Sequence, residues 1–227
     1  MIRKIFIHGW SFSREIWADF KTIDFAEFID LPFHNNFSYC ADKNILENFS
    51  REITRKINKG NNPVILIGWS LGATIAVLTA LKNPKNLNKI ILIGFSPKFN
   101  HLDLGHNPLY IKAFMMALRK NFNQTIYNFR FESTGKKFEN IPIPQKEGSI
   151  KILKEYIQLD LTSQLSKINV PTILIHGTND KIVNYKGSVY SYKKIKNSSL
   201  ILLKSHHAPF LTHKNQFLET INRQVNI

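Results

Sequence analysis

The sequence predicts an α/β protein in which a mostly parallel, doubly wound sheet carries helices on both faces. Two observations lead to this fold class. Short apolar, β-branched runs alternate along the chain with longer segments of helical periodicity. One such run, residues 64–67, enters a G-x-S-x-G pattern at residues 68–72 and continues directly into a helix-forming stretch. A serine in that pattern, here Ser70, stands on a tight strand-to-helix turn with its hydroxyl at the edge of the sheet.

The alternation is visible element by element. Strands are expected at residues 4–8, 29–32, 64–67, 89–93, 173–176 and 199–203. Residues 45–59 repeat apolar side chains at a four-residue spacing, which predicts an amphipathic helix that ends before Pro63. Residues 71–81 open with small side chains, which allow a helix to lie close to the sheet. A last helix is expected at residues 216–225.

One segment does not fit the alternation. Residues 99–167 contain helix-like stretches at 109–122 and 149–161, separated by a glycine and proline-rich break. Long insertions at this point of a doubly wound sheet usually form a lid over the site. We therefore predict a core of residues 1–98 and 168–227, with residues 99–167 as an inserted helical lid.

The charged residues of the chain indicate which kinds of partner it can bind. The 227 residues include 31 Lys and Arg against 16 Asp and Glu, a net charge of +15. This charge has two readings: a lysine-rich genome composition, or attraction to an acidic partner. Nucleic acid is disfavoured because the chain has no dense basic run and no motif that interleaves basic and aromatic residues.

Redox chemistry and membrane insertion are disfavoured as well. Cys40 is the only cysteine, so the chain forms no intrachain disulfide. No metal-ligand spacing is present, and we expect neither a metal nor a cofactor. No apolar stretch is long enough to cross a membrane or to serve as a secretory segment, which predicts a cytoplasmic protein with no membrane partner.

A serine hydroxyl becomes a nucleophile only with a base in contact and a third group that orients the base. In this architecture the chain order is Ser, acid, His. Asp180, in the turn after the strand at 173–176, is the expected acid, with Asp160 as a weaker alternative. The base follows the last strand, where His206 and His207 both qualify.

The remaining polar groups have lesser expected roles. The backbone N–H groups of Trp10 and Leu71 are the predicted oxyanion donors. Trp10 and Trp69 flank the serine with apolar bulk and are predicted to contact the substrate. We expect His8 to shape the turn after the first strand. Ordinary lid, strand-end or surface positions are expected for His101, His106, His176 and His213.

These residues resemble a known family. His8-Gly9-Trp10, the pattern at 68–72, Phe95-Ser96-Pro97, Asp180 in its turn and the His-Ala-Pro-Phe sequence at 207–210 resemble the BioH-type carboxylesterases of biotin synthesis. These α/β-hydrolases cleave pimeloyl-[acyl-carrier protein] methyl ester. The resemblance extends over most of the chain, and it places the catalytic histidine at His207.

The resemblance also has implications for the lid. It implies that Phe129 lines an acyl pocket and that the acidic acyl-carrier protein is the partner, which fits the net positive charge. Gln124 and Asn128 stand where the family has carrier-binding arginines, and the following lid segment is shorter. The replacement charges are then expected at three residues, Arg119, Lys120 and Arg130, with Lys136 and Lys137 also available. A monomer is expected.

Two other functions remain open on the sequence. The first is a general short-chain carboxylesterase or thioesterase that uses the lid only as an acyl pocket. The second is a non-catalytic binding protein built on a hydrolase fold, because fold does not determine function. An intact set of Ser70, Asp180 and His207 disfavours the second.

Overall fold

The computed structural model describes residues 1–40 and 43–225. Its centre is a six-stranded sheet with the strand order β2-β1-β3-β4-β5-β6, in which every neighbouring pair is parallel. The strands are β1 (Arg3–Ile7), β2 (Ala26–Ile29), β3 (Val64–Trp69), β4 (Leu87–Ile93), β5 (Thr172–Gly177) and β6 (Ser198–Leu203). The predicted parallel sheet is confirmed.

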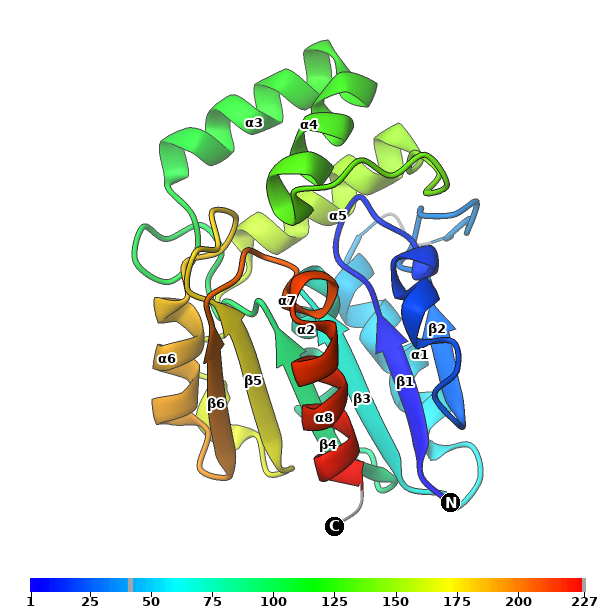
Figure 1. Cartoon of the computed structure of the whole chain (residues 1–227). Helices are drawn as coiled ribbons and strands as arrows, with labels where there is room; N and C mark the ends of the chain where they lie inside the picture. Colours follow the sequence, from blue (N-terminus) through cyan, green and yellow to red (C-terminus); the bar gives the residue numbers. More distant parts are fainter. Residues whose placement is uncertain (41–42, 226–227) are drawn as a thin grey trace.

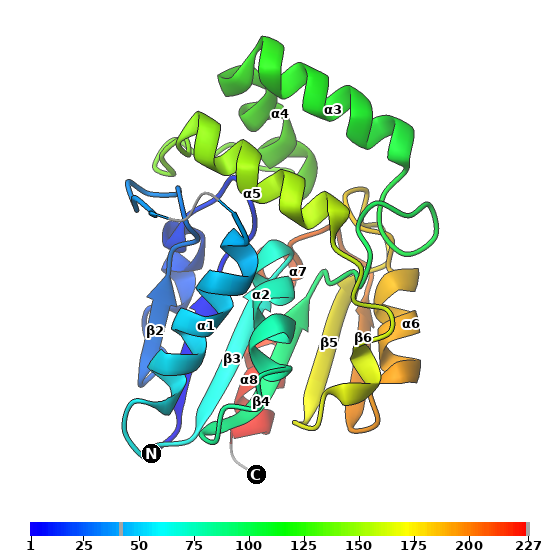
Figure 2. The same ribbon diagram turned by 180° about the vertical axis from the view of Figure 1, so that it is seen from behind.

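Helices cover both faces of this sheet. The elements against or beside the sheet are η1 (Arg14–Phe20), α1 (Ile45–Asn58), α2 (Leu71–Ala80), η2 (Leu165–Lys167), α6 (Lys186–Lys194), α7 (Pro209–Thr212) and α8 (Lys214–Val225). Figure 1 shows α8 crossing one face, and Figure 2 shows α1 and α2 on the other. The predicted doubly wound arrangement is therefore confirmed.

Strand side chains divide between two apolar cores. On β1, Ile5 and Ile7 pack into the core beneath α1 and α2, whereas Phe6 points into the core beneath η1 and α8. The side chain of Trp69, at the end of β3, belongs to the second of these cores. This follows from the two-residue period of a strand, which sends successive side chains to opposite faces.

Three α-helices lie between β4 and β5 in the sequence: α3 (Pro108–Lys120), α4 (Phe122–Thr134) and α5 (Lys146–Gln158). Figures 1 and 2 show them above the edge of the sheet where the strands end. The predicted helix at 109–122 is in fact divided at Asn121. Its N–H donates to Ala117 O, closing α3, and its side-chain oxygen accepts from Gln124 N, opening α4.

Other boundaries differ by a few residues. The strand predicted at 29–32 is β2, which ends at Ile29, before Pro32, a residue with no N–H for a sheet ladder. The helix α6 was not among the predicted elements. The division of the chain into a core and an inserted lid at 99–167 stays a prediction.

Candidate active site

Ser70 lies between β3 and α2 in a strained backbone conformation, with φ 54° and ψ −116°. Its N–H donates to Ile93 O (2.8 Å), which ties the turn to the end of β4. A side chain at Gly72 has no room, because a Cβ there would lie 2.3 Å from Ile7 O. The turn is thus held against β1 and β4, and a non-glycine residue at φ > 0 in such a place is typical of a functional position.

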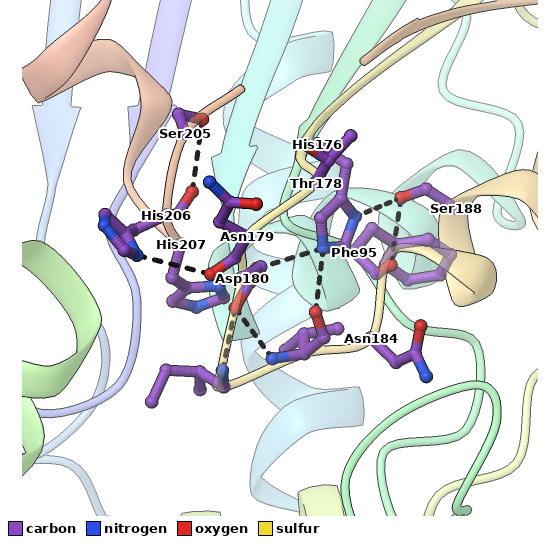
Figure 3. Close-up of polar contacts among 12 residues, drawn as sticks. Phe95, His176, Thr178, Asn179, Asp180, Asn184, Ser188, Ser205, His206 and His207 are labelled. Atoms are coloured by element: carbon purple, nitrogen blue, oxygen red, sulfur yellow. Dashed lines mark hydrogen bonds and ion pairs between the residues drawn. The ribbon is translucent and has the colours of Figure 1, made fainter. Parts of the chain in front are cut away.

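Asp180 and His207 are directly hydrogen-bonded. His207 Nδ1 donates to Asp180 Oδ2 over 2.6 Å, and both side chains are buried (Figure 3). The other carboxylate oxygen, Oδ1, accepts from the N–H groups of Ile182 (2.8 Å) and Val183 (2.9 Å). This arrangement fixes the protonated nitrogen of His207 as Nδ1 and leaves Nε2 as a free base.

Trp69 and Gly94 both pack against His207 and hold its ring in place. Trp69 Nε1 donates to His207 O (2.8 Å), and the two rings pack with centroids 5.4 Å apart. On the other side is Gly94, at φ 59°, where a Cβ would lie 2.9 Å from His207 Cε1. His207 Nε2 is buried and has no hydrogen-bond partner among the described residues, Ser70 Oγ included. Such contacts are often long in ligand-free enzymes and tighten with substrate bound.

His176 is a second histidine on the same carboxylate. Its Nε2 donates to Asp180 Oδ2 (3.0 Å) and to Val183 O (3.0 Å), and its Nδ1 lies 2.7 Å from Ser188 Oγ (Figure 3). Ser188 Oγ in turn donates to Phe95 O (3.1 Å). The sequence placed His176 at a strand end, where it lies in β5, but did not anticipate its contact with Asp180. Only the distance of four residues from Asp180, at a strand end, could have suggested the contact.

The two histidines dominate the electrostatics of Asp180. Burial on its own would raise the pKa of this carboxyl, but the charge of His207 and the hydrogen bonds from His176 and His207 outweigh burial and lower it. Asp180 is therefore a carboxylate throughout the neutral range. It can orient an imidazole and stabilise an imidazolium.

The loop after β1 lies against the serine. A Cβ at Gly9 would be 3.2 Å from Ser70 Cβ. His8 shapes this loop as predicted, because its Nδ1 donates to Gly9 O (2.8 Å) and its Nε2 accepts from Leu31 N (3.0 Å). Within the described residues, no hydrogen bond engages the backbone N–H of Trp10 or of Leu71.

A narrow, mostly apolar cavity opens at Ser70. Its lining comprises Trp10, Ser70, Phe99, His106, Tyr110, Ile111, Phe114, Phe129, Leu153, Tyr156, Ile157 and Ile182. Trp10 and Phe129, which the sequence singled out as substrate contacts, are both in this lining, with ring centroids 5.2 Å apart. The cavity is roofed by residues of α3, α4 and α5.

Trp69 is not part of that lining, so its predicted contact with substrate is wrong. Its ring is buried on the opposite face of the sheet, beside Phe12 and Phe210. The adjacent Ser70 faces the cavity, and the strand period turns the preceding side chain away. Trp69 instead supports His207 from behind.

The three basic residues proposed for the lid differ in exposure. Arg119 and Lys120 are exposed on the last turn of α3. Arg130 is 1% exposed, and its guanidinium donates to the carbonyl oxygens of Ser11, Ile141 and Pro142. The prediction that Arg130 contacts a carrier protein is therefore wrong, because the charge faces the interior.

No group of three or more His, Cys, Asp or Glu side chains in residues 1–40 and 43–225 is placed to hold a metal ion. Within the same ranges, no helix combines the length and the apolar character needed to span a bilayer.

The chain is similar to known proteins in sequence and in fold. A family profile described as "Serine aminopeptidase, S33" matches residues 38–208. A pimeloyl-[acyl-carrier protein] methyl ester esterase of Wigglesworthia glossinidia brevipalpis is 31% identical, over 97% of this chain and 92% of its own length. The chain belongs to this family of α/β-hydrolase esterases.

Further relatives agree with the assignment. A pimeloyl-[acyl-carrier protein] methyl ester esterase of Nitrosospira multiformis is 28% identical over 96% of the chain and 92% of its own length. Among solved structures, an esterase from Exiguobacterium antarcticum superposes with a TM-score of 0.85 over 99% of this chain and 92% of its own, at 21% identity. The predictions of an α/β-hydrolase fold and of a serine carboxylic ester hydrolase are confirmed.

Proposed function

We propose that this esterase hydrolyses the methyl ester of a pimeloyl group carried on acyl-carrier protein, a step in biotin biosynthesis, and that it acts in the cytoplasm. The relatives bear names for this activity. One observation supports the chemistry above all others. The 2.6 Å pair of Asp180 and His207 lies beside the strained turn of Ser70, whose hydroxyl faces an apolar cavity.

In the proposed reaction Ser70 Oγ attacks the ester carbonyl carbon while His207 Nε2 takes the hydroxyl proton. The negative charge that forms on the carbonyl oxygen is stabilised by the N–H groups of Trp10 and Leu71, each worth about 3 kcal/mol of barrier. His207 then returns its proton to the departing methoxide, which leaves as methanol. Asp180 stabilises the imidazolium between these two steps.

A water molecule completes the cycle. It loses a proton to His207 Nε2 as its oxygen attacks the acyl-enzyme carbonyl, and the proton passes to Ser70 Oγ as the carboxylic acid leaves. The polymethylene chain of the substrate would occupy the cavity, whose aromatic and aliphatic lining includes Phe114 and Phe129. Helices α3, α4 and α5 would act as the lid.

The carrier would be held by charge outside the cavity. Arg119 and Lys120 are the exposed candidates at the end of α3. Gln124 and Asn128, which the family resemblance places at arginine positions, are exposed on α4. They are hydrogen-bonded to each other, with Gln124 Nε2 donating to Asn128 Oδ1 (2.9 Å). Pairing of basic side chains with an acidic carrier would chiefly raise the association rate and would weaken with salt.

Methanol release from carrier-linked and free pimeloyl methyl ester tests the function. We expect a higher kcat/KM for the carrier-linked ester, and we expect Ser70→Ala to abolish turnover of both. Arg119→Gln with Lys120→Gln should remove much of the carrier preference, whereas Lys59→Gln, beyond the far end of α1, should not. Equal kcat/KM for the two esters would instead indicate a general short-chain carboxylesterase or thioesterase.

Growth provides an independent test. The wild-type gene should complement a biotin-auxotrophic strain that lacks its own esterase, and Ser70→Ala should not. Failure of an expressed, folded wild-type protein to complement would contradict the proposed substrate. The monomeric state stays a prediction, which sedimentation of the purified protein would test.

A further inference from the structure

Both oxygens of the Asp180 carboxylate are fully hydrogen-bonded, but by different kinds of donor. Oδ1 accepts from two N–H groups of its own turn, those of Ile182 (2.8 Å) and Val183 (2.9 Å). Oδ2 accepts from two side chains, His207 Nδ1 (2.6 Å) and His176 Nε2 (3.0 Å), as Figure 3 shows. His176 thus shares with the proposed base the oxygen that the base uses, and the reaction proposed above gives His176 no part.

His176 carries a proton on Nε2 whatever the charge of its ring. Nε2 lies 3.0 Å from Asp180 Oδ2 and 3.0 Å from Val183 O, and both of these oxygens can only accept a hydrogen bond. A bare nitrogen would face them with its lone pair, which is repulsive at that distance. The side chain is fully buried, so its N–H bond is directed at these two oxygens rather than at solvent.

The imidazole of His176 is held on its other edge as well. Its Nδ1 lies 2.7 Å from the hydroxyl of Ser188, a buried residue of α6, and that hydroxyl lies 3.1 Å from Phe95 O. Phe95 follows Gly94, which packs against the ring of His207. The contacts therefore form a circuit from the base through the carboxylate, His176 and Ser188 back to the loop beside the base. Rotation of the imidazole would break contacts at both of its nitrogens, so the donor is preorganised.

A donor on Oδ2 changes the charge that the base experiences. Burial on its own would raise the pKa of Asp180, but the charge of His207 and the hydrogen bonds from His176 and His207 lower it. A hydrogen bond that stabilises the carboxylate attracts negative charge toward its own proton. Less of that charge is then left to stabilise a protonated imidazole on the other side of the same oxygen.

We propose that His176 acts on the reaction through Asp180, without contact with the substrate. Its Nε2–H shares the negative charge of Oδ2, so that His207 is a free base at a lower pH than it would be without this donor. Because the N–H groups of the turn hold the carboxylate through Oδ1, loss of His176 should leave Asp180 in position and change chiefly the charge on Oδ2. The role rests on the proposed function, in which His207 must be uncharged to accept the proton of Ser70.

Other titratable side chains lie near this pair and bear on any pH dependence. His106, before α3, and Tyr156, on α5, interact with the charge of Asp180. Burial lowers the pKa of His106 and raises the pKa of Tyr156, so neither carries a charge near neutral pH. Lys181 and His206, next to the pair in the sequence, are exposed. All four are the same in the variants below, so a difference between pH profiles reports the change at position 176.

The pH dependence of kcat/KM for a free ester tests this role without a carrier protein. Dimethyl pimelate has no titratable group, so the acid limb of its profile reports the enzyme. In His176→Phe we expect the midpoint of that limb to rise by about 0.5–1 pH unit, which lowers kcat/KM about 3- to 10-fold at one pH unit below the wild-type midpoint. At the high-pH plateau KM should be unchanged, because His176 is not part of the cavity lining.

His176→Gln is the matched variant, because a glutamine amide can donate to Asp180 Oδ2 as the imidazole does. It should bring the midpoint most of the way back to that of the wild type. Thr172→Val is the control for a purely structural effect, since it removes a buried hydroxyl that donates to Val170 O (3.0 Å) at the other end of β5. This variant should be less stable than the wild type but should keep the wild-type midpoint.

The wild-type protein provides a second readout that does not depend on how well a variant folds. With isotopically labelled histidine, NMR should show a proton bonded to His176 Nε2 across the pH range of activity. A bare Nε2 in that range would overturn the role of His176.

The kinetic outcomes separate this role from the proposed function. An unchanged or lower midpoint in folded His176→Phe, or equal shifts in His176→Phe and His176→Gln, would overturn the role of His176 and leave the esterase intact. If folded wild-type protein released no methanol from the ester, or if Ser70→Ala kept its turnover, the proposed function would be wrong and this role with it.

Discussion

Arg130 of α4 donates from Nε to the carbonyl oxygen of Ser11 over 3.0 Å, and its Nη2 donates to the same oxygen. Ser11 has φ 71° and directly follows Trp10 in the loop that lies against the nucleophile. The same guanidinium donates to Ile141 O and Pro142 O, each over 2.8 Å. One buried cation thus connects α4, the segment after α4 and the loop proposed to supply an oxyanion donor.

This connection makes a prediction about stability. No carboxylate among the described residues pairs with Arg130, and burial lowers the pKa of its guanidinium to about 10, so it is still protonated at pH 7. Arg130→Met would leave the buried carbonyls of Ser11 and Ile141, and the part-buried carbonyl of Pro142, without this donor. This should lower the free energy of unfolding by more than about 3 kcal/mol. Urea unfolding would measure it. The exposed control Arg119→Met should change stability by less than about 0.5 kcal/mol.

A second consequence concerns activity. Because the Ser11 peptide adjoins Trp10, Arg130→Lys should keep the protein folded but lower kcat, since a lysine cannot reach three carbonyls at once. Full stability in Arg130→Met, or an unchanged kcat in Arg130→Lys, would show that the contacts neither stabilise the fold nor position the loop.

A buried histidine, His34, contacts the same loop at Ser11 and should make the stability of the protein depend on pH. Ser11 N donates to His34 Nε2 (3.1 Å), and His34 Nδ1 donates to Pro32 O (2.8 Å), so the buried imidazole is neutral. Burial lowers the pKa of His34 from 6.5 to about 3. Between these values only the unfolded chain binds the proton, so the stability that His34 contributes falls as the pH falls.

The free energy of unfolding that His34 contributes should fall by about 2 kcal/mol between pH 7 and pH 5. Urea unfolding of the wild type and of His34→Gln at both pH values would isolate it, because the other titrating groups are common to the two proteins. The variant should lose less stability on acidification than the wild type. An equal loss of stability on acidification in the two proteins would contradict a neutral, buried His34.

The assignment of the catalytic acid is tested by two matched substitutions. Asp180→Asn would place an amide against His207 Nδ1, which favours the wrong tautomer and should reduce kcat about 10⁴-fold. Asp160, the alternative acid, is exposed and paired with Lys98 over 2.7 Å, and that hydrogen bond, followed by those from Thr162, lowers its pKa to about 2. Asp160→Asn should leave kcat within about twofold. A larger loss from Asp160→Asn would reverse the assignment.

Gly94 offers a test of how tightly His207 is seated. Gly94→Ala would introduce a methyl group 2.9 Å from His207 Cε1 at a backbone φ of 59°. Gly135→Ala imposes a similar cost at φ 70°, about 1–2 kcal/mol, but its Cβ would meet nothing within 4 Å. The first variant should lose at least about tenfold in kcat beyond the second. Equal kcat values would show that the imidazole moves aside freely.

The residues that the sequence placed well are those whose role is set locally. The turn at Ser70 follows from its two glycines and the adjoining strand and helix. The order Ser, acid, His along the chain indicated Asp180 but left both His206 and His207 open, and the resemblance to the family selected His207. The turn depends on backbone geometry that nearby residues determine, so a single sequence carries it.

The errors concern long-range packing. Arg130 was expected to contact the carrier as a replacement for the lid charge that the family resemblance implies, but its three carbonyl partners come from residues 11, 141 and 142. Trp69 was placed in the cavity because it adjoins Ser70, although the strand period turns it away. The contacts of His176 with Asp180 and of His34 with Ser11 depend on how loops meet in space, which neither periodicity nor motif spacing specifies.

Covalent labelling of Ser70 tests the central claim most directly. A fluorophosphonate phosphonylates a serine, with loss of fluoride, only where a base and an oxyanion site activate the hydroxyl. Intact mass should show one adduct on the wild-type protein, peptide mapping should place it on Ser70, and Ser70→Ala should gain no mass and lose ester hydrolysis. An unmodified wild-type protein that is folded, or a Ser70→Ala variant that still turns over the ester, would contradict the account.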